Sequence, residues 1–392
     1  MSTRTAATSP PAVWTVPFAL VCLTSLATFT NYMMLNPVLP LQITRLGETA
    51  AFVGVTIAAF SGASVLARPF MGSAVDRRGS GLILAIGAGL LTLASLVYVV
   101  PSLIGLLIAR MAHGIGWAAV NTAGTTLAAE VAPPLRRGEA MGWLSLSKAL
   151  AAAIAPAFGL LLLGALGYEM TFAAAAGIGA IALVIATVLT RRNGPVVRRG
   201  GSMASLDASS IIPAAILALV YAGNPLVQSF IVLLVVDRGI EGVPVYYLIS
   251  GIVLILVQPL ARISDRVGRG PNMAIGLAGV ATGLVLVFAA GDLPLLVLGG
   301  AIWSAGVGLV EPASTALALD MAPPDRRGAA MATYTAAFQV GNAGGALTWG
   351  FVIATAGFEA ALAGAAGCAV VALVILKLGW GRVRAAAPAR AA

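Results

Sequence analysis

Residues 101–159 read PSLIGLLIARMAHGIGWAAVNTAGTTLAAEVAPPLRRGEAMGWLSLSKALAAAIAPAFG, two apolar runs joined by a short basic turn. Three cationic or titratable side chains, Arg110, His113 and Lys148, fall inside the apolar runs. A charge near the centre of a bilayer costs about 2.5–3.5 kcal/mol on insertion scales, so such residues normally face a protein-lined interior. The turn sequence EVAPPLRRGEAMG recurs 190 residues later as DMAPPDRRGAAMA. This stretch therefore predicts polar sites within membrane helices and an internal repeat.

Composition indicates an integral membrane protein. Hydrophobic residues make up 59% of the chain and charged residues 9%, whereas an average soluble domain carries about 25% charged residues. Apolar runs recur at about 20 residues, enough to cross a hydrocarbon core of about 30 Å as a helix. The runs are continuous and lack the alternation of a membrane barrel strand. We therefore predict an all-α, multi-pass protein of a bacterial inner or plasma membrane.

Several functional classes are disfavoured by the sequence. The formal charge of +9 comes from arginines in short turns, not from one basic patch of the kind that binds nucleic acid. Cys22 and Cys368 lie in apolar runs and the chain has one histidine, so we expect no disulfide, metal or cofactor. No GxxxxGK[ST] sequence is present, which argues against ATP as the energy source. The sequence shows no Ser/His/Asp, Cys/His or paired-carboxylate arrangement of the kind that catalyses reactions in enzymes, so we do not expect an enzyme.

Twelve spans are predicted. Lys and Arg cluster in alternate loops, with only Arg45 and Arg238 in loops on the other side, so both termini are predicted to be cytoplasmic by the positive-inside rule. The polar segment 191–209 separates an N-terminal bundle, 1–190, from a C-terminal bundle, 210–392. The spans lie near 14–40, 50–71, 81–100, 102–131, 138–164, 168–190, 210–236, 243–262, 271–290, 294–321, 328–355 and 358–379.

The two halves are related by sequence at offsets of 188 to 190 residues. Four matches carry this relation: Asn36-Pro37 with Asn224-Pro225, Asp76-Arg77 with Asp265-Arg266, Gly79 with Gly268, and Pro133-Pro134 with Pro323-Pro324. Parallel six-span repeats are a transporter architecture in which the substrate site lies near the midplane between the halves. The repeat therefore predicts a transporter, and we expect it to act as a monomer.

These motifs resemble the major facilitator superfamily across nearly the whole chain. GSAVDRRGSG, with Gly72, Asp76, Arg77 and Gly79, is similar to the family's loop-2/3 signature, and ARISDRVGRG repeats it around Asp265, Arg266 and Gly268. RMAHGIGWAA is similar to the fourth-span signature of drug/proton antiporters. The fifth span keeps Gly142, Pro156 and Gly159 of the antiporter pattern but has Ala151 and Ala155 at two glycine positions. The combination most resembles bacterial exporters of the staphylopine-metallophore and sugar-efflux sort. We expect the charged turns of the two repeated loops to form a cytoplasmic gate, with charges that only set topology as the alternative.

Polar and aromatic side chains within spans are the candidates for a substrate cavity, because amides and indoles in lipid would leave hydrogen-bonding groups unsatisfied. Arg110 and His113 are three residues apart and share a helix face. Lys148 lies roughly 15 Å into its span, too deep to reach the interface. For each of these candidates the alternative is a structural role, in which the side chain hydrogen-bonds to a neighbouring helix. The candidates are Lys148, Arg110, His113, Asn31, Asn36, Asn121, Asn224, Gln228, Trp303, Gln339 and Asn342.

Glu311 is the sole carboxylate deep in a span, and His113 is the only histidine. Glu311 is the leading candidate for a proton carrier and His113 the second, with a structural ion pair and simple packing as the alternatives. We expect proton-coupled export of a small organic solute, favoured to bear carboxylates because Arg110 and Lys148 outnumber Glu311. Uptake or facilitated diffusion on the same fold, and a membrane receptor without transport, are the alternative functions.

Overall fold

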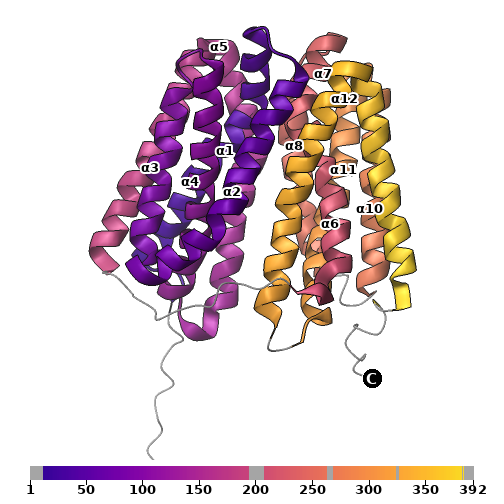
Figure 1. Cartoon of the computed structure of the whole chain (residues 1–392). Coiled ribbons are helices and arrows are strands. Elements are labelled where there is room, and N and C mark those ends of the chain that lie inside the picture. Colours follow the sequence, from indigo (N-terminus) through magenta and orange to yellow (C-terminus); the bar gives the residue numbers. More distant parts are fainter. Residues whose placement is uncertain (1–11, 194–206, 263–267, 324–325, 382, 384–392) are drawn as a thin grey trace, which may run out of the picture.

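The computed structural model shows a chain built of long helices arranged as two bundles side by side (Figure 1). It describes residues 12–193, 207–262, 268–323, 326–381 and 383, and these residues form no strand. In this described part, ten helical segments are long and apolar enough to cross a membrane. The all-helical, multi-pass architecture predicted from composition is therefore confirmed.

The first bundle contains α1 (Val16–Arg45), α2 (Ala50–Arg78), α3 (Ser80–Val97), α4 (Leu103–Val131), the short η1 (Pro134–Arg136) and α5 (Arg137–Asn193). Two of these helices have an N-cap side chain that accepts a hydrogen bond from the first helical turn. Thr15 accepts a hydrogen bond from the Phe18 N–H at 3.4 Å, and Ser102 accepts one from Gly105 at 3.2 Å. Such caps satisfy donors that the first helical turn leaves unpaired.

Helix α5 has 57 residues and changes direction at Gly167, where φ is 79° and ψ −179°. The Arg137 side chain donates to the Ala129 carbonyl at 3.2 Å, so α5 begins beside the end of α4. Its last turn returns to the same side, because Thr190 lies against Gly81 at the start of α3. The two spans predicted at 138–164 and 168–190 are thus one helical element that reverses at a glycine.

The second bundle contains η2 (Ala208–Ser210), α6 (Ile211–Ala222), η3 (Leu226–Phe230), α7 (Ile231–Arg238), α8 (Val243–Val257), η4 (Gln258–Arg262), α10 (Arg269–Ala289), α11 (Leu293–Met321) and α12 (Arg327–Leu378). Helix α12 reverses at Gly357, where φ is 86° and ψ 174°. The span predicted at 210–236 is divided into α6, the π-helical turn η3 and α7. This division matters for the site described below.

Backbone conformation reproduces the internal repeat. Gly79 and Gly268 have φ of 88° and 104° and precede α3 and α10, while Gly167 and Gly357 reverse α5 and α12 with φ of 79° and 86°. Glycine adopts these positive φ values without the steric penalty that other residues meet. The repeat therefore extends from the sequence to the positions where the chain turns.

The two bundles meet along a limited set of helices. Helix α2 packs against α12, α5 against α8, and α1 against η3 and α7. We call the side on which α1 begins and α5 ends the linker side, and the side on which α1 ends and α2 begins the far side. The linker itself, 194–206, lies outside the described residues.

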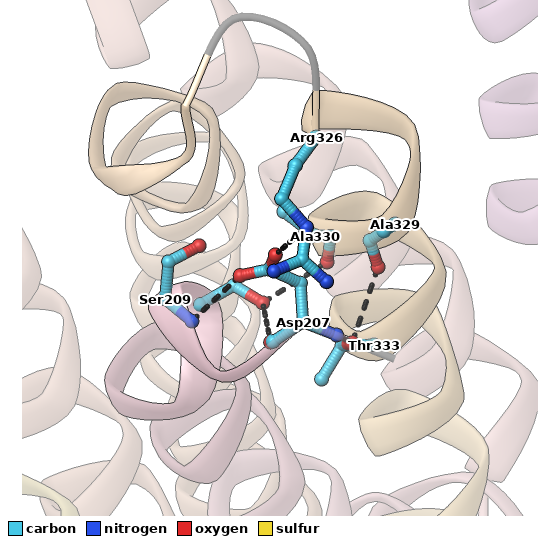
Figure 2. A network of polar contacts seen from close by, with 7 residues as sticks. Asp207, Ser209, Arg326, Ala329, Ala330 and Thr333 are labelled. Carbon is cyan, nitrogen blue, oxygen red and sulfur yellow. Dashed lines mark hydrogen bonds and ion pairs between the residues drawn. The ribbon is translucent and has the colours of Figure 1, made fainter. Parts of the chain in front are cut away.

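Asp207 fixes the start of the second bundle to the start of α12 on the linker side (Figure 2). Its carboxylate lies 2.9 Å from the Arg326 Nε, and its backbone N–H donates to the Thr333 hydroxyl at 2.8 Å. The Ser209 N–H donates to Asp207 Oδ1 at 2.7 Å, and the Ser210 hydroxyl donates to the Ala330 carbonyl at 3.1 Å. Hydrogen bonding from Ser209, together with the Arg326 guanidinium, holds the pKa of Asp207 below its usual value.

Replacing this buried carboxylate should lower stability in a pH-dependent way. Because the folded-state pKa of Asp207 is depressed, its stabilisation is fully present above the unfolded pKa near 3.8 and is lost as the pH falls through the folded value. We expect Asp207→Asn to lower the unfolding temperature at pH 7, and the difference from the parent to shrink towards pH 3. Scanning fluorimetry of purified protein measures both; Asp237→Asn, at an exposed position in α7, is the control. An equal difference at both pH values would contradict an ionic origin.

Candidate functional site

A cavity of about 340 Å³ lies between the two bundles, and both contribute to its walls. This volume falls at the lower end of the range for pockets that hold small molecules. Arg68 and Glu311 are its only charged lining residues among those that the structure describes. The other lining residues are Phe29, Tyr32, Met33, Asn36, Phe60, Trp117, Asn121, Ala152, Tyr221, Asn224, Val227, Gln228, Tyr246, Tyr247, Ser250, Gly251, Leu254, Trp303, Ser304, Val307, Phe338, Gln339 and Asn342.

One wall of the cavity is built around the break between α6 and α7. The Asn224-Pro225 sequence interrupts the helix, because proline has no N–H to donate, and the chain continues through η3 as a π-helical turn. Side chains from neighbouring helices satisfy the carbonyls there. Trp349 Nε1 donates to Ala222 at 2.7 Å, while the Tyr246 and Tyr247 hydroxyls donate to the Val227 and Gln228 carbonyls at 3.1 and 3.0 Å. The break brings Asn224 and Gln228 into the cavity wall.

Glu311 occupies the same wall, ten residues before the end of α11 at Met321. Ten residues of helix span roughly 15 Å, so its carboxylate lies deep in the bundle on the linker-side half. It is nevertheless solvent-exposed, because it faces the cavity. The Tyr221 hydroxyl donates to Glu311 Oε2 at 2.8 Å, and the Tyr334 hydroxyl donates to its backbone carbonyl at 3.2 Å. No cation of the described residues forms an ion pair with it.

Aromatic rings form the opposite wall. Tyr32 and Phe60 stack with their centroids 4.8 Å apart and an angle of 15° between the ring planes. Trp117 lies 4.2 Å from Tyr32 and 4.4 Å from Phe29, centroid to centroid. These rings come from α1, α2 and α4, which gives the first bundle a continuous apolar surface that a planar group can stack upon.

Arg110 and His113 lie behind this wall and not in the cavity. Arg110 is 2% exposed, with its guanidinium carbon 5.0 Å from the Phe60 ring centroid, and His113 is fully buried with Nδ1 3.3 Å from the Tyr98 hydroxyl. Among the described residues, Arg110 Nε and Nη1 and His113 Nε2 have no hydrogen-bond partner. The two residues do share a helix face, as their spacing predicted, but that face is turned towards the interior of the first bundle.

Lys148 likewise does not line the cavity, but it contacts two residues that do. Its ammonium lies 3.5 Å from the Asn121 amide oxygen and 5.1 Å from the Phe29 ring centroid, and both of those residues line the cavity. Asn31 serves packing, because its side-chain amide donates to the Ser95 hydroxyl at 2.9 Å and to the Ala175 carbonyl at 2.7 Å. Thus Asn31, Arg110, His113 and Lys148 support the cavity wall instead of forming it.

The remaining sequence candidates converge on the cavity. They are Asn36, Asn121, Asn224, Gln228, Trp303, Glu311, Gln339 and Asn342. Sequence reasoning missed Arg68, which begins the stretch RPFMGSAVDRR at the end of a predicted span, where basic residues commonly set topology. It also missed Tyr32, Tyr246 and Tyr247. In the sequence, the only feature that could have marked them as cavity residues is a polar hydroxyl within an apolar run. Their roles become visible only when neighbouring helices are in place.

The motif residues fall on the linker side and within α5. Asp76 and Arg77 end α2 and form no ion pair with another described residue, and Asp265 and Arg266 lie outside the described part of the chain. In α5, a Cβ on Gly159 would clash with the Met34 carbonyl, so this glycine permits α5 to pack closely on α1. Gly142 has open space around it, Gly72 likewise, and Pro156 is buried inside α5.

On the far side the two bundles touch through backbone. A Cβ on Gly54 of α2 would clash with the Ala346 carbonyl of α12, and a Cβ on Gly350 would lie 2.7 Å from the Ala50 carbonyl. Nearer the cavity, the Asn342 side-chain amide donates to the Ser61 hydroxyl at 3.0 Å and accepts from Asn224 at 3.0 Å. These contacts close the cavity towards the far side in this conformation.

Comparison with known proteins points to one family. A family model described as Major Facilitator Superfamily matches residues 21–262 and 200–391. An uncharacterized MFS-type transporter of Methanocaldococcus jannaschii is 23% identical over 351 residues, covering 85% of this chain and 90% of that protein. The quinolone resistance protein NorA of Staphylococcus aureus is 26% identical over 162 residues, 41% of this chain and 42% of NorA. A POT family transporter crystallised with 5-aminolevulinic acid shares the fold, with a TM-score of 0.80 at 14% identity, covering 95% of this chain and 96% of that one.

The far-side closure predicts that a bulky residue at Gly54 opens it. Overpacking typically costs 1–3 kcal/mol, and each 1.4 kcal/mol changes a conformational equilibrium about tenfold. We therefore expect Gly54→Val to raise labelling of a single cysteine at Gln228 by a membrane-impermeant maleimide applied from the far side, in a background lacking Cys22 and Cys368. Gly62→Val is the matched control on the same helix, because a Cβ there meets no atom within 4 Å. Equal labelling of both variants would contradict the assigned closure.

Proposed function

Because the chain belongs to the Major Facilitator Superfamily, we propose that it is a secondary active transporter that exports a small organic solute in exchange for protons. The family and the fold are those of multi-pass membrane transporters and not of enzymes. The observation that carries the proposal is the polar cavity between the bundles, with Glu311 as its sole carboxylate among the described lining residues. A site at this position is where repeat transporters bind their cargo.

The proposed organisation is twelve membrane crossings in two parallel repeats, 1–190 and 210–392, joined by the linker 191–209. The reversals at Gly167 and Gly357 support it, since each divides one long helix into two crossings. The linker side would be cytoplasmic, because basic residues are concentrated there and Arg45 and Arg238 are the exceptions on the far side.

Alternating access would follow from rocking of the two bundles about the cavity. The far-side contacts at Gly54 and Gly350 would separate when the cavity opens outwards. The repeated loops would close the linker side in that state, with Asp76 and Arg77 on one and Asp265 and Arg266 on the other. Charged side chains on tight glycine turns are suited to this role, since they can pair across bundles and separate in water.

Glu311 would carry the proton, with His113 as a weaker candidate. Glu311 faces the cavity and is held by one hydrogen bond from Tyr221, whereas His113 is sealed behind the aromatic wall. A carrier must meet water from each side in turn, and only a cavity-lining group does so when the bundles rock. The partial match to a quinolone resistance protein supports export over uptake and adds drugs to the candidate cargo. Uptake or facilitated diffusion is the alternative.

Neutralising Glu311 should separate exchange from accumulation. We expect Glu311→Gln to exchange cargo across vesicles at saturating concentration, yet to fail to concentrate it when a proton gradient is imposed. Its activity should also lose the pH dependence of the parent, because the amide cannot release a proton. The cargo for these vesicle assays is the solute giving the largest stabilisation in a thermal screen of amino-acid-derived chelators, sugars and drugs.

Glu241→Gln provides the control, because Glu241 is an exposed carboxylate between α7 and α8. It should accumulate cargo as the parent does. Full proton-driven accumulation by Glu311→Gln with loss in His113→Ala would transfer the carrier role to the histidine. Accumulation by both would refute proton coupling through these residues. Equilibration of cargo by the parent, with no accumulation under an imposed proton gradient, would favour the facilitated-diffusion alternative.

A further inference from the structure

Arg68 is a cation in the cavity wall, and the proposed transport mechanism gives it no role. It lies on α2 two helical turns beyond Phe60, and the spacing of eight residues puts both on one face of the helix. It is ten residues before the end of α2 at Arg78, a depth of roughly 15 Å from the linker side. Arg68 therefore adds a positive charge to the edge of the aromatic surface.

Arg68 has no charged partner within the part of the chain that the structure describes. The ion pairs there join Arg136 to Glu139, Arg238 to Glu359, Arg269 to Asp320 and Arg326 to Asp207. A guanidinium offers five donors in a planar fork that matches a carboxylate in two parallel hydrogen bonds. An unpaired arginine in a cavity wall is suited to an anionic group that arrives with the ligand.

Glu311 supplies the opposite charge on the other bundle, and it lies as many residues from its helix end as Arg68 does. Each residue lies ten positions from the linker-side end of its helix, Arg68 on α2 and Glu311 on α11. Tyr221 occupies one oxygen of the Glu311 carboxylate, and no hydrogen bond within the described residues uses the other. The two charges therefore face one cavity from opposite walls, with the rings of Tyr32 and Phe60 farther from the linker side.

Resting on the proposed transport function, we propose that the cargo is amphoteric. Arg68 binds its carboxylate or similar anionic group, Glu311 binds its ammonium group, and the planar or apolar body lies against the wall of Tyr32, Phe60 and Trp117. The cavity thus selects molecules that carry both charges over molecules that carry one. Arg68, and not Arg110 or Lys148, determines the preference for an anionic group.

Three probes with one shared phenyl ring test this directly. L-phenylalanine carries both charges, phenethylamine only the ammonium and 3-phenylpropionate only the carboxylate, and each is small enough for the cavity. Binding to the purified full-length protein is measured by thermal stabilisation over a concentration series. We expect the zwitterion to bind about tenfold more tightly than either singly charged probe, the ratio that 1.4 kcal/mol supplies.

Substitutions then test which residue binds each charged group of L-phenylalanine. Arg68→Gln should reduce affinity for L-phenylalanine to that for phenethylamine, while phenethylamine binding is unchanged and reports that the variant is folded. Arg68→Lys should restore part of the preference, and Arg192→Gln, an exposed arginine near the end of α5, should leave it intact. Glu311→Gln should lower L-phenylalanine affinity to that for 3-phenylpropionate.

Equal affinity of the parent for all three probes, or binding of none, overturns the proposal. Retention of the zwitterion preference by Arg68→Gln overturns the role of Arg68. Failure of the proposed transport function would give a different result from failure of the amphoteric-cargo proposal. The binding preference would persist in detergent, but vesicles containing the parent would show neither exchange nor proton-driven accumulation of L-phenylalanine.

Discussion

The cavity depends on one constraint, namely that every backbone carbonyl freed inside a membrane must find a donor within the protein. The helix that crosses the second bundle first is broken at Asn224-Pro225, and three side chains from α8 and α12 satisfy the carbonyls around the break. Tyr246, Tyr247 and Trp349 therefore hold an irregular turn in place through direct hydrogen bonds. Tyr246 and Tyr247 also line the cavity, so these two residues both stabilise the break and shape the volume beside it.

The two repeats differ in their polar contacts and in the continuity of their first helix. On the linker side, where the third crossing begins beside the end of the fourth, the first bundle uses a hydrogen bond from Ser80 to Glu130 at 2.6 Å. The second bundle uses an ion pair from Arg269 to Asp320 at 3.2 Å at the same place. The counterpart of the broken Asn224-Pro225 turn is Asn36-Pro37, which remains inside the continuous helix α1. One bundle thus presents a stiff aromatic surface and the other an irregular polar one, and the asymmetry gives the cavity its two unlike walls.

Sequence alone predicted the membrane class, the family and the repeat, because apolar length, turn motifs and constant offsets are local or periodic signals. It also identified most of the amides in the cavity, since an amide within an apolar span needs a polar partner or water. It failed at Arg110 and His113, because their spacing fixes which helix face they share but not whether that face meets the cavity or a neighbouring helix. Arg68 was missed for the converse reason: its position near a basic helix end masked a side chain that the packing of α2 against the second bundle turns inwards.

The opposite charges of Arg68 and Glu311 in the lining of one cavity have an electrical consequence. With Glu311 ionised the two fixed charges cancel, whereas with Glu311 protonated the cavity carries the single positive charge of Arg68. An amphoteric cargo is also neutral overall, so exchange against one proton would transfer one elementary charge per cycle. That transfer is worth about 2.3 kcal/mol for each 100 mV of membrane potential. The voltage across the membrane would then drive the cycle even where the acidity on the two sides is equal.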